Sequence, residues 1–298
     1  PDWMQARLKA VGISPKNMLV DVTNYISLDR CRPLHVYDVA KIGKTIRARR
    51  GRAAVSGDNR YQVAKAAARL RALKITEIED HLSEYGLSAT EYEYKDEIEP
   101  FGSIDEYVRA LKRMNENSDA FLALDGDWYI AAEHHCVIAD DERCLGLGGV
   151  MGGEYSGCTG ETTDVFVESA WFDPAITRVT GRETGIDSDA KYRFERGVDP
   201  GFVIDGLELA TRMIMTICGG EPSDVFKAGE IPASPAPIAF DPARVKRLLG
   251  IELSPERITD ILDRLGFEVN AKSTPWSVKP PSWRRDCSQA ADLIEEIA

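Results

Sequence analysis

Long hydrophobic runs are missing from this sequence, although 43% of its 298 residues are apolar. A helix that crosses a bilayer needs about 20 consecutive apolar residues. The chain has no such run and no secretory signal pattern. Its apolar residues nevertheless suffice for the cores of two domains. We therefore expect a protein that has no contact with a membrane.

Closely spaced cysteine pairs are absent too. None of the six cysteines belongs to a Cys-x-x-Cys motif, and they are scattered along the chain at Cys31, Cys136, Cys144, Cys158, Cys218 and Cys287. This distribution favours reduced thiols in a cytoplasmic protein over a disulfide framework or a zinc site.

Positive charge is in deficit. The chain carries 37 Lys and Arg against 49 Asp and Glu, which gives a net charge of −12. Affinity for the phosphates of a nucleic acid depends on clustered Lys and Arg. The charge balance therefore excludes a general nucleic-acid coat, while contact with RNA through a local patch stays compatible with it.

Glycine, by contrast, is abundant between residues 145 and 200. Residues 146–153 form a glycine-dense turn, and because no Lys-Ser or Lys-Thr follows it, the turn is not a P-loop. The apolar residues Val165 to Val167 come next and end on Glu168. Glycine lets a ligand approach the backbone closely, and a single acid at the end of an apolar strand suits the polar group of a pocket. The stretch predicts a small-molecule pocket.

The polar residues of this candidate pocket come from both ends of the stretch and from the N-terminal segment. They are Asn24, His35, Glu168 and Ser188-Asp189-Ala190, beside Gly148-Gly149. A site that hydrogen-bonds a polar tip of its ligand rejects analogues without that tip, because its own polar group would stay unpaired. His35 suits proton handling or the positioning of water. The alternative is a satisfied structural histidine and a strand-end ion pair at Glu168.

Two further groups have side chains that bind metals. Asp292, Glu295 and Glu296 share one helical face, and Asp286 lies just upstream. Clustered carboxylates suit Mg²⁺, but the spacing alone favours a solvated acidic face. The second group, Glu133-His134-His135-Cys136, reads as a strand whose neighbouring side chains point to opposite faces. We interpret that group as accidental.

The hydrophobic pattern predicts an α+β fold with a mixed or antiparallel sheet, flanking helices and two domains. Residues 51–119 read as a helical insert of unknown role without a chemical motif, and the proline-rich residues 231–237 as a stiff linker. The domains are then 1–230 and 236–298. The second reads as helix, helix, hairpin and helix, a small winged-helix-like α/β module. In the larger domain, helices are expected at 1–12, with Met4, Leu8 and Val11 on one side, after the cap at Asp173-Pro174, and at 201–218. Strands are expected at 18–22, 45–49, 136–139 and 165–167.

Several motifs together carry a resemblance to a known family. Those of the larger domain are Leu19-Val20-Asp21-Val22-Thr23-Asn24-Tyr25, Pro33-Leu34-His35, Gly149-Val150-Met151-Gly152-Gly153, Glu168-Ser169-Ala170-Trp171-Phe172-Asp173-Pro174 and the residues 192–200. Val245 to Gly250 and Pro280 to Asp286 belong to the smaller one. The sequence resembles the bacterial phenylalanyl-tRNA synthetase beta subunit, in its editing domain and the small module that follows. The resemblance covers nearly the whole chain except the insert.

The resemblance implies tRNA binding and hydrolysis of tyrosine wrongly attached to phenylalanine tRNA, in support of phenylalanine–tRNA ligase activity. Glu168 would recognise the tyrosine hydroxyl and His35 would position water or the ester. The matching residues Asn24, Gly148, Gly149, Ser188 and Ala190 would line the site. An ordered water would attack the ester carbonyl, and editing would need no cofactor. No Ser or Cys triad indicates a covalent intermediate.

The resemblance also implies partners and a metal. The alpha subunit would be one partner, in a heterotetramer, and it would share a Mg²⁺ site with Asp286, Asp292, Glu295 and Glu296. This expectation reverses the one from spacing. The chain would start inside the editing domain and stop before the catalytic-like domain. It would then neither bind ATP nor aminoacylate tRNA alone.

Departures from the family pattern leave alternatives open. The insert has no counterpart in that pattern, Gly148 and Ser188 stand where alanine and threonine are common, and Ala290 stands where an acid often occurs. One alternative is a tRNA- or protein-interaction module without hydrolysis. DNA binding by the C-terminal module is weaker, since its basic residues are too few: Arg244, Lys246, Arg247, Arg284 and Arg285.

Overall fold

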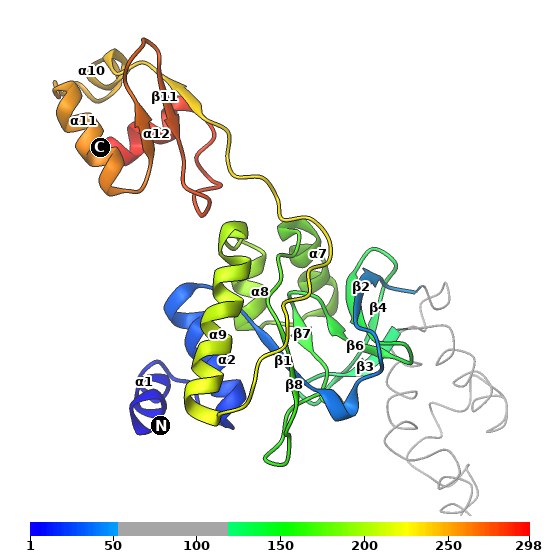
Figure 1. Ribbon diagram of the computed structural model, residues 1–298. Coiled ribbons are helices and arrows are strands. Elements are labelled where there is room, and N and C mark those ends of the chain that lie inside the picture. Colours follow the sequence, from blue (N-terminus) through cyan, green and yellow to red (C-terminus); the bar gives the residue numbers. More distant parts are fainter. Residues whose placement is uncertain (53–118) are drawn as a thin grey trace, which may run out of the picture. The chain divides into compact units, whose positions relative to one another are not determined.

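The computed structural model describes residues 1–52 and 119–298. The expected insert at 51–119 therefore lies almost entirely outside the described residues. The described chain forms two compact units: residues 1–25, 33–52, 119–168 and 172–196 make up the first, and residues 26–32, 169–171 and 197–298 the second. Every described strand pairing is antiparallel and helices accompany the sheets, which confirms the α+β class (Figure 1). No described helix is long and apolar enough to cross a bilayer.

The N-terminal segment is helical throughout. Helix α1 spans Asp2–Ala10 and buries Met4 and Leu8 as predicted, although Val11 after its end is exposed. Helix α2 spans Met18–Arg30, where a strand was predicted over residues 18–22. The amide oxygen of Asn17 accepts a hydrogen bond from the N–H of Val20 and so caps the helix. A short apolar run is compatible with either structure, and the cap decides for the helix.

The main sheet of the first unit has the strand order β2-β5-β6-β7. Its strands are β2 (Arg47–Arg50), β5 (Cys136–Ala139), β6 (Cys144–Leu147) and β7 (Met151–Gly152). The predicted strands near 45–49 and at 136–139 are confirmed, with β2 at the edge. Strands β3 (Asp119–Leu122) and β4 (Trp128–Ala131) form a hairpin over the Asp125-Gly126 turn. Phe121, Val137, Leu147, Val150 and Ile186 share one core.

A separate two-stranded ladder carries the residues of most interest. Strand β1 (His35–Asp38) continues into a 3-10 turn, η1 (Val39–Lys41), and pairs with β8 (Val165–Glu168). Helix α7 (Pro174–Thr184) follows β8. The carboxylate of Asp173 accepts the N–H groups of Ala175 and Ile176, as the Asp-Pro signature predicts. Helix α8 (Asp189–Phe194) comes next.

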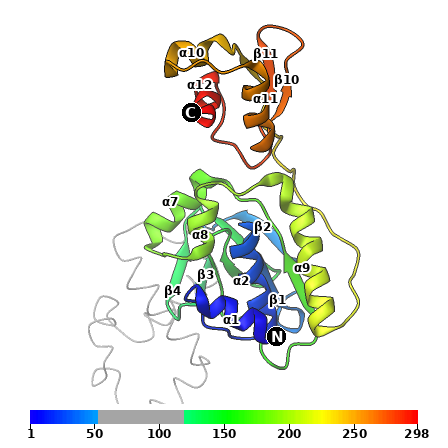
Figure 2. The same ribbon diagram turned by 90° about the vertical axis from the view of Figure 1, so that its left-hand side faces the viewer.

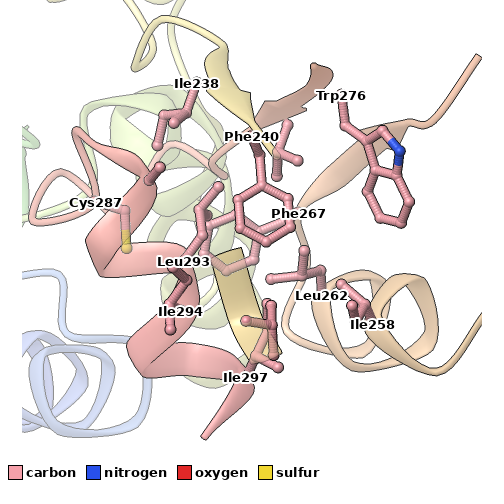
Figure 3. Packing of buried hydrophobic residues seen from close by; sticks show 13 residues of the cluster. Ile238, Phe240, Ile258, Leu262, Phe267, Trp276, Cys287, Leu293, Ile294 and Ile297 are labelled. Atoms are coloured by element: carbon pink, nitrogen blue, oxygen red, sulfur yellow. The ribbon is translucent and has the colours of Figure 1, made fainter. Parts of the chain in front are cut away.

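The second unit contains the long helix α9 (Val203–Cys218), which follows η3 (Pro200–Phe202). Its C-terminal part comprises β9 (Ile238–Phe240), α10 (Ala243–Leu249), α11 (Pro255–Arg264), β10 (Glu268–Asn270), β11 (Trp276–Lys279) and α12 (Ala290–Ile297) (Figure 2). The predicted order of helix, helix, hairpin and helix is confirmed. Strand β9 was not predicted; it pairs with β11 and completes a three-stranded sheet. Phe240, Leu262 and Leu293 are fully buried in a core of apolar residues (Figure 3).

Candidate functional site

The pairing of β1 with β8 brings two candidate residues together. His35 and Glu168 are direct partners in the antiparallel ladder, and partners across such a pair project from the same face. Side chains two residues apart on a strand share a face, so Tyr37 joins them. The rings of His35 and Tyr37 are 4.4 Å apart between centroids. The Tyr37 hydroxyl donates a 2.7 Å hydrogen bond to Oε2 of Glu168.

His35 is enclosed by its neighbours although the residue keeps some exposed surface. Its Nε2 is fully buried and has no hydrogen-bond partner among the described residues. A Cβ placed on Gly152 would lie 2.4 Å from Cε1 of the imidazole, so the ring packs directly against the glycine. Burial lowers the pKa of His35 to about 4. The imidazole is therefore neutral at physiological pH, with a ring nitrogen left for a ligand or water.

Glu168 lies in a setting that opposes its charge. Burial raises the pKa of this carboxyl, and the hydrogen bond from Tyr37 counteracts part of that rise. Cys136 is close by: burial and then the Glu168 charge raise the pKa of its thiol to about 11. Such a thiol stays protonated and is a poor nucleophile. The face thus offers a carboxyl acceptor and a neutral imidazole, which can bind a hydroxyl and a water.

The glycines of the dense turn pack closely against a neighbouring aromatic ring. A Cβ on Gly148 or Gly149 would lie within 2.6 Å and 2.8 Å of the Phe172 ring. The side of these glycines that was expected to admit a ligand is thus filled by a buried phenylalanine. Only their backbone groups are left for a ligand. The two glycines therefore let the turn pack against the loop that precedes α7. The turn then continues to Gly152, which lies beside His35.

The remaining expected site residues lie around this face rather than on it. The Ser188 hydroxyl donates to the carbonyl of Val150 at 2.5 Å and accepts the N–H of Lys191, so it caps α8 and ties that helix to the glycine turn. Ala190 follows in the first turn of α8. Asn24 is half-buried on α2. Among the described contacts, none joins Asn24 to His35 or Glu168.

Three residues of this neighbourhood were missed from the sequence: Tyr37, Cys136 and Phe172. Tyr37 follows His35 at the spacing of two that places strand residues on one face, which is the signal that would have found it. Cys136 begins a strand that was predicted, but its nearness to Glu168 depends on tertiary packing. Phe172 carries no local signal for its contact with the glycines.

His134, His135 and Glu183 form the one group of three potential metal ligands with atoms within 4.8 Å of one another in residues 1–52 and 119–298. The interpretation of the pair as strand residues was wrong, because both histidines lie in the turn before β5. Their Nε2 atoms contact the same oxygen, Oε2 of Glu183, at 2.7 and 2.9 Å.

The hydrogen bonds of His135 disfavour a metal at this cluster. Its Nδ1 accepts the N–H of Ala132, so the proton of the neutral ring is on Nε2 and is donated to Glu183. A metal on Nε2 would require that proton on Nδ1, where the backbone N–H points. Burial lowers the pKa of His135, and the bond from His135 lowers the pKa of Glu183. The cluster links the turn to the end of α7.

The acidic set near the C-terminus is already engaged within the chain. Arg284 donates to Asp286 and to Glu296, each at 2.6 Å, and these bonds lower the pKa of both carboxyls. Asp292 accepts the N–H groups of Ser288 and Gln289 and closes a capping box at α12. Glu295 is exposed. As they stand, these side chains fit an ion pair and a helix cap rather than an Mg²⁺ ligand set.

A shallow hollow in the same unit is lined by Pro235, Arg285 and Cys287, and none of the expected site residues lines it.

Comparisons with known proteins agree with the motifs. Residues 1–64 and 103–219 match the B3/4 domain family, and residues 238–298 match the tRNA synthetase B5 domain. Phenylalanine–tRNA ligase beta subunits from Rhodopseudomonas palustris and Cereibacter sphaeroides are 39% and 40% identical over 297 and 298 residues. Each alignment takes in 100% of this chain and 29% of the relative, so the chain spans less than a third of the length of these relatives.

The comparisons differ in whether they cover the residues of the expected insert. The B3/4 match passes over residues 65–102, whereas the alignments with both relatives run through the whole chain. Among solved structures, an N-terminal fragment of the phenylalanyl-tRNA synthetase beta subunit from Pyrococcus horikoshii is 17% identical. It covers 94% of this chain and 64% of its own, with a TM-score of 0.36.

Proposed function

Because the chain belongs to the family of phenylalanine–tRNA ligase beta subunits, we propose that the face formed by His35, Tyr37 and Glu168 is an editing site. The site removes tyrosine from phenylalanine tRNA that has been mischarged with it. The observation that carries the proposal is a half-buried carboxyl, Glu168, opposite a histidine whose Nε2 is buried and unpaired. We place this reaction in the cytoplasm, where tRNA is charged.

Glu168 supplies the discrimination. A carboxylate accepts a hydrogen bond from a phenol, and phenylalanine has no group that can donate one. A buried acceptor left unpaired costs free energy, so the site favours the ligand with the hydroxyl.

In the hydrolysis, the oxygen of a water bonds to the ester carbonyl carbon and the bond to the ribose oxygen breaks. The ribose oxygen leaves with a proton. The neutral imidazole of His35 positions that water.

The names of the relatives support two partners, phenylalanine tRNA and an alpha subunit.

The Mg²⁺ expected at the acidic set would have to displace Arg284 from Asp286 and Glu296. The residues therefore do not fit the metal in this chain alone, and the proposed hydrolysis uses none. The matches on either side of residues 231–237 support a domain boundary in that linker.

The test is deacylation of tyrosyl-tRNA by the complete ligase that carries Glu168→Ala. A hydrogen bond to a charged acceptor is worth about 10- to 100-fold in rate, and we expect a loss of that size. Glu168→Gln keeps an acceptor oxygen and should recover part of it. Glu161→Ala, which removes an exposed carboxylate, is the matched control. If Glu168→Ala releases tyrosine as fast as the unchanged enzyme, the proposed role is wrong. Binding of tyrosyl-tRNA without turnover by the unchanged enzyme would instead favour an interaction module.

A further inference from the structure

Tyr37 contributes a phenol to the carboxyl that is proposed to read a phenol. Its hydroxyl donates to Oε2 of Glu168 at 2.7 Å. Tyr37 is only 3% exposed, and its ring packs against His35 and lies 5.9 Å from the ring of Phe166, its partner on β8. The phenol is therefore a buried part of the wall of the proposed site.

The bond divides the two oxygens of Glu168 between the protein and a ligand. Oε2 is taken by Tyr37. Oε1 accepts no hydrogen bond from the described residues, and it is not among their fully buried, unpaired atoms. A carboxylate without a second anchor can rotate about its last bond and present either oxygen. With Oε2 held, Oε1 is presented alone and in one orientation.

The bond also favours the charged form of Glu168. Burial disfavours a carboxylate, and a hydrogen bond donated to it acts in the opposite direction. Burial and the Tyr37 hydrogen bond thus shift the pKa of Glu168 in opposite directions. The bond favours the charged carboxylate, which is the form that accepts hydrogen bonds. Two other titratable groups lie near this carboxyl. The thiol of Cys136 can only add negative charge, and the neutral imidazole of His35 adds none.

We propose that Tyr37 is a positioning and specificity-determining residue of the editing site, where it holds Oε2 of Glu168 so that Oε1 accepts the hydroxyl of a tyrosyl ester. This inference rests on the proposed function. Glu168 then binds two phenols at once, one from the chain and one from the ligand. A ligand without a hydroxyl leaves Oε1 unpaired.

The experiment compares hydrolysis of tyrosyl-tRNA and phenylalanyl-tRNA by the complete ligase with Tyr37→Phe. The measured quantity is the ratio of kcat/KM for the two esters. Phenylalanine keeps the ring and its packing, so we expect only the tyrosyl reaction to slow, and the ratio to fall about tenfold. Tyr129→Phe is the matched control, because it removes a hydroxyl that donates to another carboxylate, Asp125, in the same unit.

The outcomes separate this inference from the proposed function. If Glu168→Ala loses the discrimination and Tyr37→Phe keeps it, the inference is overturned and the editing site stands. Equal slowing of both esters by Tyr37→Phe also overturns it, because that result indicates a merely structural residue. If Glu168→Ala itself changes nothing, both the proposed function and the inference fail.

A second measurement uses the unchanged chain and so does not depend on how the variant folds. The hydroxyl proton of Tyr37 is followed by NMR while free tyrosine is added. The inference expects this proton to stay protected from exchange with water, since the Tyr37 bond persists beside the ligand. Loss of protection on binding would mean that the ligand phenol replaces Tyr37, which would overturn the inference.

Discussion

At the scale of single residues, the site depends on close packing around a neutral histidine. His35 keeps its place because Gly152 leaves room for its ring. The same enclosure lowers the pKa of the imidazole and leaves Nε2 without a hydrogen-bond partner among the described residues. A ring that stays uncharged can hold a water by accepting or donating a hydrogen bond, without adding a positive charge beside Glu168.

Gly152→Ala tests this packing. The new Cβ would lie 2.4 Å from Cε1 of His35, so the ring has to move. Overpacking of this kind costs about 1–3 kcal/mol. We expect the free energy of unfolding, measured in urea, to fall by that amount and tyrosyl-tRNA hydrolysis to drop with it. Gly160→Ala is the control, because a Cβ there meets nothing within 4 Å. Equal urea midpoints for the two variants would contradict the packing described for His35.

At the scale of elements, the ladder of β1 and β8 brings together the residues of the proposed site. The acidic set near the C-terminus holds the start of α12. Arg284 lies in the loop before that helix and joins Asp286, in the same loop, to Glu296 on α12. Of the two carboxylates, only that of Glu296 is well shielded from solvent: the Glu296 side chain is 20% exposed and the Asp286 side chain 64%. Solvent therefore screens the contribution of Asp286.

Arg284→Met should destabilise the protein at neutral pH and much less in acid. We expect a loss of about 1–2 kcal/mol at pH 7, mostly from Glu296. The folded-state pKa values of Asp286 and Glu296 lie below their unfolded values. Their stabilisation is therefore complete above the unfolded values and is lost as the pH falls through the lowered ones. Urea denaturation at pH 7 and at pH 3 measures this difference.

The control for that prediction is Arg257→Met. Arg257 pairs with Asp260 on the surface of α11, where both side chains are about half exposed. Such a pair contributes at most about 1 kcal/mol. If Arg284→Met destabilised the protein no more than Arg257→Met, or by the same amount at both pH values, the acidic set would be an ordinary solvated face.

At the scale of the whole molecule, the C-terminal module could be predicted almost completely from sequence. Its helices begin at recognisable signals, such as Ser254-Pro255, and end at Gly250 or near Gly266. Strand β9 was missed because its three residues directly follow a proline-rich linker and have no alternation long enough to read. In the larger domain, the Asp173-Pro174 cap predicted α7 correctly for the same local reason.

What could not be predicted depends on contacts between distant residues. The sequence motifs place His35 and Glu168 in one site, but only the strand register shows them as direct partners. Tyr37 was missed because the strand that carries it was not predicted. The apolar residues 18–22 predict a strand, but the cap at Asn17 decides for a helix. The glycines at 148 and 149 suggested space for a ligand, and the space belongs to Phe172, whose contact no local pattern reveals.

The central claim is that Glu168 reads a phenolic hydroxyl. A crystal structure of the chain with tyrosine bound tests it most directly. The account predicts the tyrosine hydroxyl within about 2.5–3.0 Å of Oε1 of Glu168, with the Tyr37 bond to Oε2 intact. A tyrosine bound with its hydroxyl turned away from Glu168, or at a place remote from His35 and Glu168, would contradict it.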